Sequence, residues 1–366
     1  MAGSRNPRKR WRQIAVADRR ETRRLARLGA RYNPNRWGNH EPRTNPNFKI
    51  KGKSRGARII KFPSVLRLGN QEQVEVVVSL LKEIRDTALK GHFKRITLDH
   101  THVTSMDPEV ALLLVAEIQR CESYCGTRTV ITGSHPKDHA ITELLIEMGF
   151  YDALDIKNPA LPQAYKPRTY VQVARRNRTL PQVADSLLEC FSGVFDFNDQ
   201  DRRRLHVALI ECMDNVFEHA YDAASDNPHL YKEWWLVGYA DHEQSSIGFA
   251  FYDQGAGIPA TIRKKQHPRV LQHLMGWTDG RWIERAVRRP ISRHESKRRG
   301  HGLDKLKKFL DSLGVNGSLR VFANQGDVEF SKGGASRVQG IKGGLDGSLI
   351  VWTLSGVKTE LPTELL

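Results

Sequence analysis

One stretch of the chain, IECMDNVFEHAYD at residues 210–222, constrains the fold more than any other. Glu211, Asn215 and His219 recur at four-residue spacing, and each such step advances about 40° past a full helical turn. These polar side chains therefore share one face of a helix, which either meets solvent or lines a site. We expect a helix over residues 199–220, N-capped at Asn198 or Asp199. Its predicted core stripe is Leu205, Ala208, Leu209, Cys212, Met213 and Val216.

The residues that follow this helix form an ordered series of motifs. A strand pair is expected at 233–241 and 246–253, and the second strand runs directly into Asp253-Gln254-Gly255-Ala256-Gly257-Ile258. About forty residues rich in lysine and arginine separate this loop from GHGLDKLKKFLDSLG at 300–314, a Gly-x-Gly motif that opens a helix at 303–312. Three strand-like runs follow at 319–323, 327–331 and 347–354. Each motif alone is common, whereas their combination in this order is specific.

This combination resembles the GHKL family of ATP-binding domains. The resemblance implies an α/β sandwich with a mixed sheet over residues 181–366, with ATP and Mg²⁺ as cofactors and an ATP lid at 259–299. The amide oxygen of Asn215 would be a metal ligand, because Mg²⁺ prefers hard oxygen ligands together with nucleotide phosphates. Asp253 would accept a hydrogen bond from the adenine amino group. The remaining expected ATP-binding residues are Gly255, Gly257, Ile258, Gly300, His301, Gly302 and Leu303; glycines permit close backbone approach, and a helix N-terminus suits phosphate.

Within this family, the motif Glu-xxx-Asn-xxx-His-Ala-Tyr resembles the anti-sigma-factor serine/threonine kinases. That resemblance implies that Glu211 is the catalytic general base for a serine hydroxyl, and we expect His219 to be structural. The 43-residue gap from Gly257 to Gly300 is longer than expected for such kinases. Two other classes therefore stay open: a non-kinase, ATP-gated module that binds nucleic acid, and a GHKL ATPase in which hydrolysis drives dimer closure.

The preceding segment, 57–155, alternates strands and helices, which predicts an α/β domain. Strands are expected at 58–62, 64–68, 95–99 and 129–132. The predicted helices cover 70–89, a segment that starts at Pro108 behind an Asp107 N-cap, and a segment from Pro136 to about Met148. The motifs ITLDHTHVTSMD, TVITG and ELLIEMGFYDAL resemble a STAS domain of the anti-sigma-factor-antagonist type.

In that family a serine at the loop-to-helix junction is phosphorylated, but this junction reads Asp107-Pro108-Glu109-Val110. The resemblance therefore implies a docking domain rather than a phosphorylation switch, with a STAS-like or sigma-like protein as a possible partner. Residues 156–180 are expected to form a linker or a connecting strand.

Charge is concentrated in two places. Residues 1–56 hold 17 lysines and arginines against three acidic residues, and residues 263–308 hold 15 against four. The first segment predicts a largely disordered tail, whose interleaved basic and aromatic residues suit nucleic acid. A solubilising or targeting role and an acidic protein partner are alternatives.

No apolar run approaches the roughly 20 residues of a membrane span, and the four cysteines form no CxxC pair. We expect a cytoplasmic regulatory protein with reduced thiols and no membrane contact, and a homodimer stays open.

Overall fold

The computed structural model describes residues 55–91, 93–125, 129–159, 168–176, 179–195, 197–216, 233–266, 271, 274, 276–288, 302–313 and 315–356. The structure is mixed α/β, with helices and several sheets, which confirms the fold class at that level. We call residues 55–159 the N-terminal unit and residues 168–356 the C-terminal unit. The basic tail expected over 1–56 lies outside the described residues except for its last two positions.

The N-terminal unit alternates strands and helices as expected. Its main sheet is parallel, with the order β1-β3-β5, formed by β1 (Arg55–Lys61), β3 (Phe93–Asp99) and β5 (Val130–Gly133). A second parallel pair joins β2 (Val65–Leu66) to β4 (Ser105–Met106). The helices are α2 (Gln71–Lys90), α3 (Pro108–Cys125), α4 (His139–Glu147) and α5 (Phe150–Ala153).

Capping residues set the starts of these helices. Asn70 caps α2 by accepting a hydrogen bond from the Gln73 N–H at 3.0 Å. The helix expected from Pro136 begins three residues later, because the Asp138 carboxylate accepts from the Ile141 N–H at 3.1 Å and thereby caps α4 at that point. α3 does begin at Pro108. The Asp107 carboxylate accepts from the Leu68 N–H at 2.8 Å and so ties the chain after β2 to the start of α3.

The C-terminal unit is built on one five-stranded sheet with the order β6-β7-β8-β10-β9. Its strands are β6 (Arg168–Arg176), β7 (Trp234–Asp241), β8 (Ser246–Asp253), β9 (Asn316–Ser331) and β10 (Ser336–Ser355). Every pair is antiparallel, so the expectation of a mixed sheet is wrong for this sheet. β7 and β8, and likewise β9 and β10, are joined by short turns, which permit antiparallel pairing alone. β6 lies within the expected linker and adds an edge strand to the sheet.

The last part of the sheet consists of two long strands instead of the three runs expected. The first two runs, 319–323 and 327–331, form one continuous strand, β9, in which Asn324 has a left-handed backbone with φ of 51°. A single such residue bends a strand without ending it. The third run forms the final part of β10.

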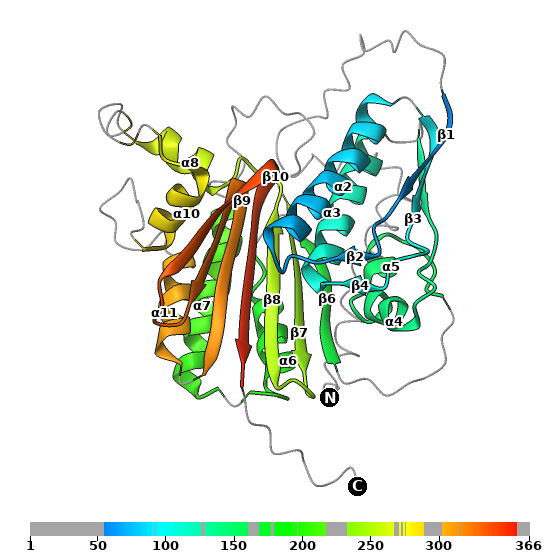
Figure 1. Cartoon of the computed structure of the whole chain (residues 1–366). Helices are drawn as coiled ribbons and strands as arrows, with labels where there is room; N and C mark the ends of the chain where they lie inside the picture. The colour runs from blue at the N-terminus through cyan, green and yellow to red at the C-terminus, as the bar shows by residue number, and fades with distance from the viewer. Residues whose placement is uncertain are drawn as a thin grey trace, which may run out of the picture.

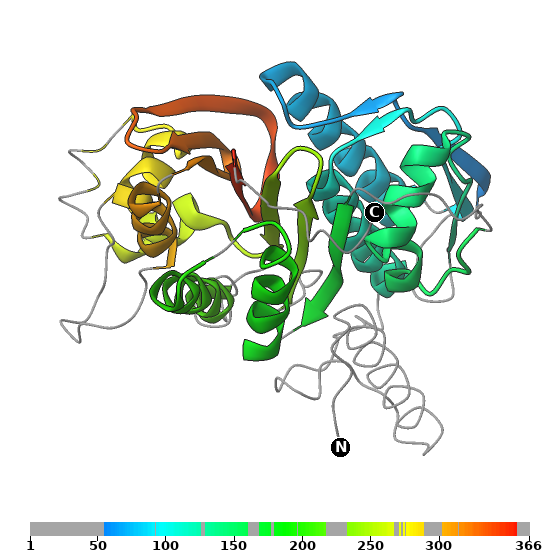
Figure 2. The ribbon, with the colours of Figure 1, turned by 90° about the horizontal axis from the view of Figure 1, so that it is seen from below.

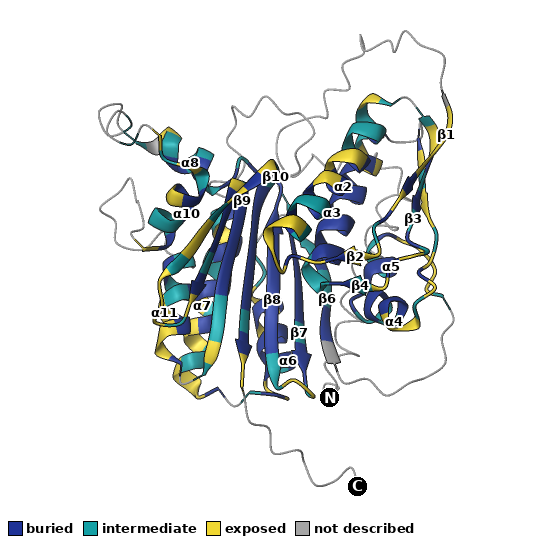
Figure 3. Ribbon diagram, viewed as in Figure 1, coloured by how far each residue is buried: buried dark blue, intermediate teal, exposed yellow. Residues whose placement is uncertain are grey.

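Helices cover both faces of the five-stranded sheet (Figures 1 and 2). One face packs against α6 (Pro181–Phe191), α7 (Asp199–Asn215) and α11 (Gly302–Ser312), and the other packs against α2 and α3 of the N-terminal unit. Alternate side chains of β7 serve the two cores: Trp234 lies in the first and Trp235 in the second. The molecule is therefore layered, with α2 and α3 between the five-stranded sheet and the β1-β3-β5 sheet, and the strands of the large sheet are mostly dark blue, that is buried, in Figure 3.

Two further helices lie in the range 259–299 that was expected to form a lid. They are α8 (Ile258–Lys265) and α10 (Asp279–Arg288). α10 buries Trp282, Ile283 and Val287, and Ile283 and Val287 belong to the core shared with α7 and α11. α10 is thus packed into the core of the C-terminal unit. Residues 289–299 lie outside the described residues, and the lid over 259–299 stays a prediction. Among the helices that the structure describes, none is long and apolar enough to cross a membrane.

Candidate functional site

The structure describes most of the residues that we expect to bind nucleotide, and these residues lie at one end of the C-terminal unit. β8 ends at Asp253, and the chain turns through Gly255 and Gly257 into α8 (Figure 1). α7 and α11 run antiparallel, because Lys305 near the start of α11 forms an ion pair with Glu211 near the end of α7. The C-terminal end of α7 therefore lies beside the N-terminal end of α11.

Asp253 is the most unusual group at this end of the sheet. Its residue is only 6% exposed although it carries a carboxyl group. One carboxylate oxygen accepts from the Gly255 N–H at 2.8 Å, and the Ser348 side chain forms a second hydrogen bond to the carboxyl group. Burial raises the pKa of Asp253 to about 7, and these two hydrogen bonds only partly oppose that effect. The carboxyl group is thus held near the midpoint of its titration at neutral pH.

The loop after Asp253 depends on a glycine. Gly257 has φ of 83°, a conformation that L side chains rarely adopt, and an added Cβ would lie 2.6 Å from Asn324 Oδ1. Asn324 in turn donates from Nδ2 to the Ala256 carbonyl at 3.1 Å, while its Oδ1 is buried with no hydrogen-bond partner among the described atoms. Asn324 thus shapes the loop from β9. The sequence analysis missed this residue, and its only signal was an Asn-Gln-Gly interruption in an apolar strand.

Glu211 lies between α7 and α11. One of its carboxylate oxygens forms the ion pair with Lys305, and the other, Oε2, is buried without a hydrogen-bond partner among the described atoms. A carboxylate with one oxygen anchored and one available can accept a proton from a bound hydroxyl or water. Lys305 was not predicted; its position three residues after Gly302 in GLDKLKK, on the first turn of α11, was the available signal.

The other predicted residues divide into those that the structure describes and those that it does not. Asn215 is the last residue of α7 and is half-buried, while Ile258 and Leu303 pack against the core that contains Cys212 of α7. Gly302 begins α11. His219, Gly300 and His301 lie outside the described residues, so their contribution stays a prediction.

Metal-ligating side chains do not cluster at this end of the unit. In the part of the chain that the structure describes, no group of three or more His, Cys, Asp or Glu residues is arranged to hold a metal ion. Mg²⁺ typically takes one or two protein ligands and completes its shell with phosphates and water. Asn215 alone would fit that pattern, and the four cysteines are buried free thiols.

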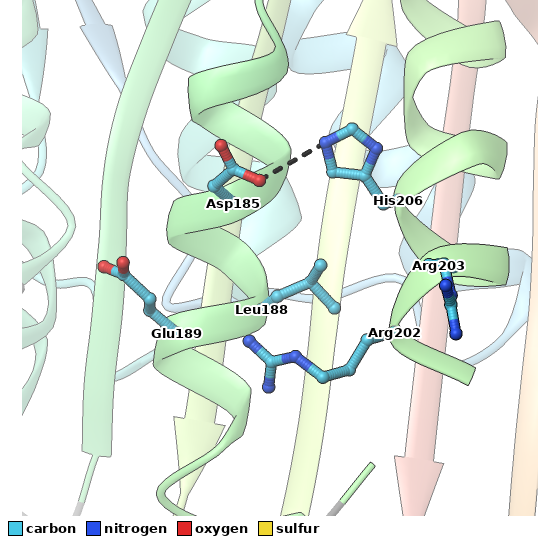
Figure 4. Close-up of a pocket in the computed structure, with 6 residues that line it drawn as sticks. All are labelled: Asp185, Leu188, Glu189, Arg202, Arg203 and His206. Atoms are coloured by element: carbon cyan, nitrogen blue, oxygen red, sulfur yellow. Dashed lines mark ion pairs between the residues drawn. The ribbon is translucent and has the colours of Figure 1, made fainter. Parts of the chain in front are cut away.

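A separate hollow of about 320 Å³ lies between α6 and α7 (Figure 4). In that hollow, His206 Nε2 approaches Asp185 Oδ1 at 3.3 Å. The lining contains none of the residues predicted to bind nucleotide; it consists of Asp185, Leu188, Glu189, Arg202, Arg203 and His206. α6 supplies the acidic side chains of the hollow and α7 supplies the basic ones, which is ordinary for a solvated helix pair, so we assign the hollow no role.

No protein-family model matches the chain, and no curated protein sequence matches it. The function must therefore be argued from the residues and their geometry.

Proposed function

We propose that the C-terminal unit is a GHKL-type domain that binds ATP with Mg²⁺. We further propose that the protein is a regulator of the anti-sigma serine/threonine kinase type, which switches partner association by nucleotide state or by phosphorylation. The observation that carries this proposal is Asp253, a buried carboxyl group at a strand end beside a glycine loop. The Asp-x-Gly-x-Gly motif alone would not distinguish such a site from an ordinary turn.

A buried carboxylate without a cation beside it is unfavourable, because burial penalises the charged form. Asp253 has hydrogen bonds from Gly255 and Ser348 but no cation among the causes that shift its pKa. The amino group of adenine would supply a donor to this carboxylate and would favour its ionised form. Gly257 has a positive φ and no side chain, so the loop backbone can approach the proposed adenine ring closely.

The helices supply the other half of the proposed site. The N-terminus of α11 provides unpaired backbone N–H groups and a positive dipole end, which favour phosphate oxygens. Asn215 ends α7 on the same side, where it would be a magnesium ligand, and Glu211 one turn earlier would be the general base. The nucleotide would then extend across the end of the sheet, with adenine at the loop after β8 and the phosphates at the start of α11.

The N-terminal unit supports a regulatory role. We propose that it is a STAS-like domain docked within its own chain, since α2 and α3 pack on the sheet face opposite α7 and α11. The contact includes polar groups: Trp235 Nε1 donates to Gln119 Oε1 at 2.8 Å. At the junction where related domains carry a phosphorylated serine, burial and then the Asp107 carboxylate raise the pKa of Glu109 to about 7.

Calorimetric titration with ATP and Mg²⁺ tests nucleotide binding. Asp253→Asn retains the size of the side chain and loses the charged acceptor, so it should weaken ATP binding by about 1–3 kcal/mol. Asp241→Asn is the matched control, because Asp241 is also a buried aspartate at a strand end, where it accepts from the Gln244 N–H at 2.9 Å. It lies at the opposite end of the sheet and should leave ATP binding unchanged. Equal affinities for wild type and Asp253→Asn would refute the adenine site.

Incubation with γ-labelled ATP separates the classes of activity. Transfer of label to a protein in a cell lysate is expected for the proposed kinase. Release of free phosphate with no labelled protein would make the chain an ATPase. ATP binding with neither product would make it an ATP-gated binding module, for which nucleic acid held by the tail is a candidate partner.

A further inference from the structure

An irregular stretch of β10 connects the proposed adenine site to the N-terminal unit. The pairing of β10 with β9 shifts register between Gly340 and Leu345 and again between Leu345 and Ser348. Three glycines in this stretch, Gly343, Gly344 and Gly347, have φ between 69° and 85°. Such bulges occur next to active sites, where they redirect side chains. A segment this rich in glycine has few side chains of its own to fix its position.

One side of this stretch touches Asp253 directly. Ser348 pairs with Asp253 in the β8–β10 ladder, and its side chain forms a hydrogen bond to the Asp253 carboxyl group. Gly347 lies so close that an added Cβ would come within 1.8 Å of the Asp253 carbonyl oxygen. A displacement of residues 346–348 would therefore displace Asp253.

The other side of the stretch is held by the N-terminal unit. The Asp346 carboxylate forms ion pairs with Arg85 Nη1 of α2 at 2.8 Å and with Arg120 Nη1 of α3 at 3.1 Å. Its carbonyl oxygen accepts from the Tyr252 hydroxyl at 2.9 Å. Asp346 is thus fixed from α2, from α3 and from the residue that precedes Asp253.

Both arginines are themselves fixed by a buried acid. Glu117 of α3 accepts from Arg85 Nε at 3.1 Å and Nη2 at 2.9 Å, and it also pairs with Arg120. Glu117 and Arg120 are only 1% and 2% exposed. Because a buried charge without its partner is strongly unfavourable, the two arginines have a strong preference for keeping both carboxylates in place.

We propose that Asp346 is a positioning residue through which α2 and α3 hold Asp253 in its adenine-binding position. The N-terminal unit then completes the nucleotide site without touching nucleotide. A change at the α2–α3 face, such as the docking of a protein partner, would alter adenine recognition, and nucleotide binding would alter that face in return. This inference rests on the proposed function, because it presupposes that Asp253 recognises adenine.

The test compares two acids that form ion pairs at the same interface: Asp346, which is partly exposed, and Asp327, which is buried. Asp346→Asn removes the charge that the arginines hold. Asp327→Asn is the control, because Asp327 forms a buried ion pair with Arg320 at 2.7 Å, and Arg320 also donates to the Leu68 carbonyl of the N-terminal unit. The measurements are the melting temperature and the affinities for ATP and for inosine triphosphate, whose 6-oxo group replaces the amino group that Asp253 would recognise.

Both variants should melt at a lower temperature, but only Asp346→Asn should lose about tenfold or more in ATP affinity together with its preference for ATP over inosine triphosphate. Arg85→Gln removes one of the two arginine partners of Asp346, so it should shift ATP affinity in the same direction by a smaller factor, and it keeps the test available if Asp346→Asn does not fold. Asp346→Glu should restore part of the preference. The inference is overturned if Asp346→Asn keeps the wild-type ATP affinity and the preference for ATP over inosine triphosphate. If Asp346→Asn does not fold, the same result for Arg85→Gln overturns it. An equal loss in Asp327→Asn would also overturn it. If the wild type binds no ATP, the proposed function fails and the inference fails with it.

Discussion

At the scale of single residues, Asp253 combines a stability defect with a proposed binding role. Its folded pKa, about 7, lies above the value of 3.8 for a free aspartate. Between pH 3.8 and about pH 7, the folded protein therefore holds a proton on Asp253 that the unfolded chain has lost. Stability therefore falls as pH rises through this window, and the full deficit is present above pH 7.

Asp253→Asn should remove that deficit. The neutral amide avoids the cost of burying a charge, so the free energy of unfolding at pH 8 should rise by about 1–3 kcal/mol, and its decline between about pH 4 and pH 7 should become shallower. Denaturant unfolding of both proteins across this pH range measures the effect. A variant that is less stable than wild type at pH 8 would show that the carboxylate is structural.

Glu211→Gln should separate binding from chemistry. The amide keeps the shape of the side chain but cannot accept a proton, so turnover should fall by about 100-fold or more while ATP affinity stays within a few-fold. Calorimetry and a labelled-phosphate assay on the same preparation give the two values. If affinity and turnover fall in parallel, Glu211 holds α7 and α11 together through Lys305 and is not the base.

Single residues of the site differ in how far the sequence could predict them. Glu211, Asn215 and Asp253 stand in motifs with fixed spacing, and the structure places all three where their motifs put them, on α7 and at the end of β8. Lys305 and Asn324 were missed because their contacts are made across 94 and 68 residues of sequence. Such pairs depend on tertiary packing, which no local pattern records.

At the scale of elements, α10 decides how large a mobile cover over the site could be. Its buried side chains Trp282, Ile283 and Val287 lie on one face of the helix. Asp279 at its start accepts from the Gln325 N–H of β9 at 2.9 Å. These contacts fix α10 to the sheet.

Ile283→Ala should therefore destabilise the whole C-terminal unit by about 2–5 kcal/mol, the usual range for a buried aliphatic truncation. Arg281→Ala, on the exposed side of the same helix, should change stability by less than about 0.5 kcal/mol. Thermal or denaturant unfolding measures both. A negligible effect of Ile283→Ala would mean that α10 is part of a separate cover after all.

Helices with strong apolar periodicity were predicted well. α2 and α11 match their expected ranges closely, and α7 begins at the expected residue, while its expected end near residue 220 lies outside the described residues. Basic residues at 263–308 suggested a solvated segment, whereas α10 within this range buries one face in the core and exposes Arg281 and Arg288 on the other. The run WWLVGYAD of β7 carries large apolar residues at consecutive positions, a sign that both faces of the strand are covered, and this sign of the N-terminal unit's docking was not used.

At the scale of the whole molecule, the two units form one layered body in which α2 and α3 belong to two interfaces at once. The sequence could indicate two α/β segments but not whether they dock on each other, because the contacts that join them, such as Trp235 to Gln119, span 116 residues. Residues 1–54 lie outside the described residues, and the role of the tail stays a prediction from composition.

Deleting residues 1–54 tests that role. If the tail binds nucleic acid, the affinity of the full chain should fall steeply with salt, because each neutralised phosphate releases counterions, and the deletion should flatten that dependence. ATP binding should be unchanged, since the tail lies outside the proposed site. Fluorescence anisotropy with labelled DNA and RNA measures the slope. Equally weak binding by both proteins at about 0.1 M salt would favour an acidic protein as the partner.

The central claim is that one end of the C-terminal unit binds ATP together with magnesium, and Asn215 is its most direct test. The measurement is the affinity of full-length protein for ATP with and without Mg²⁺, by calorimetry, for wild type and for Asn215→Ala. The half-buried position of Asn215 at the end of α7 should allow the variant to fold. We predict that Mg²⁺ strengthens ATP binding to wild type by about tenfold or more and that the variant loses most of this dependence. Absence of ATP binding by wild type, or full magnesium dependence in folded Asn215→Ala, would contradict the account.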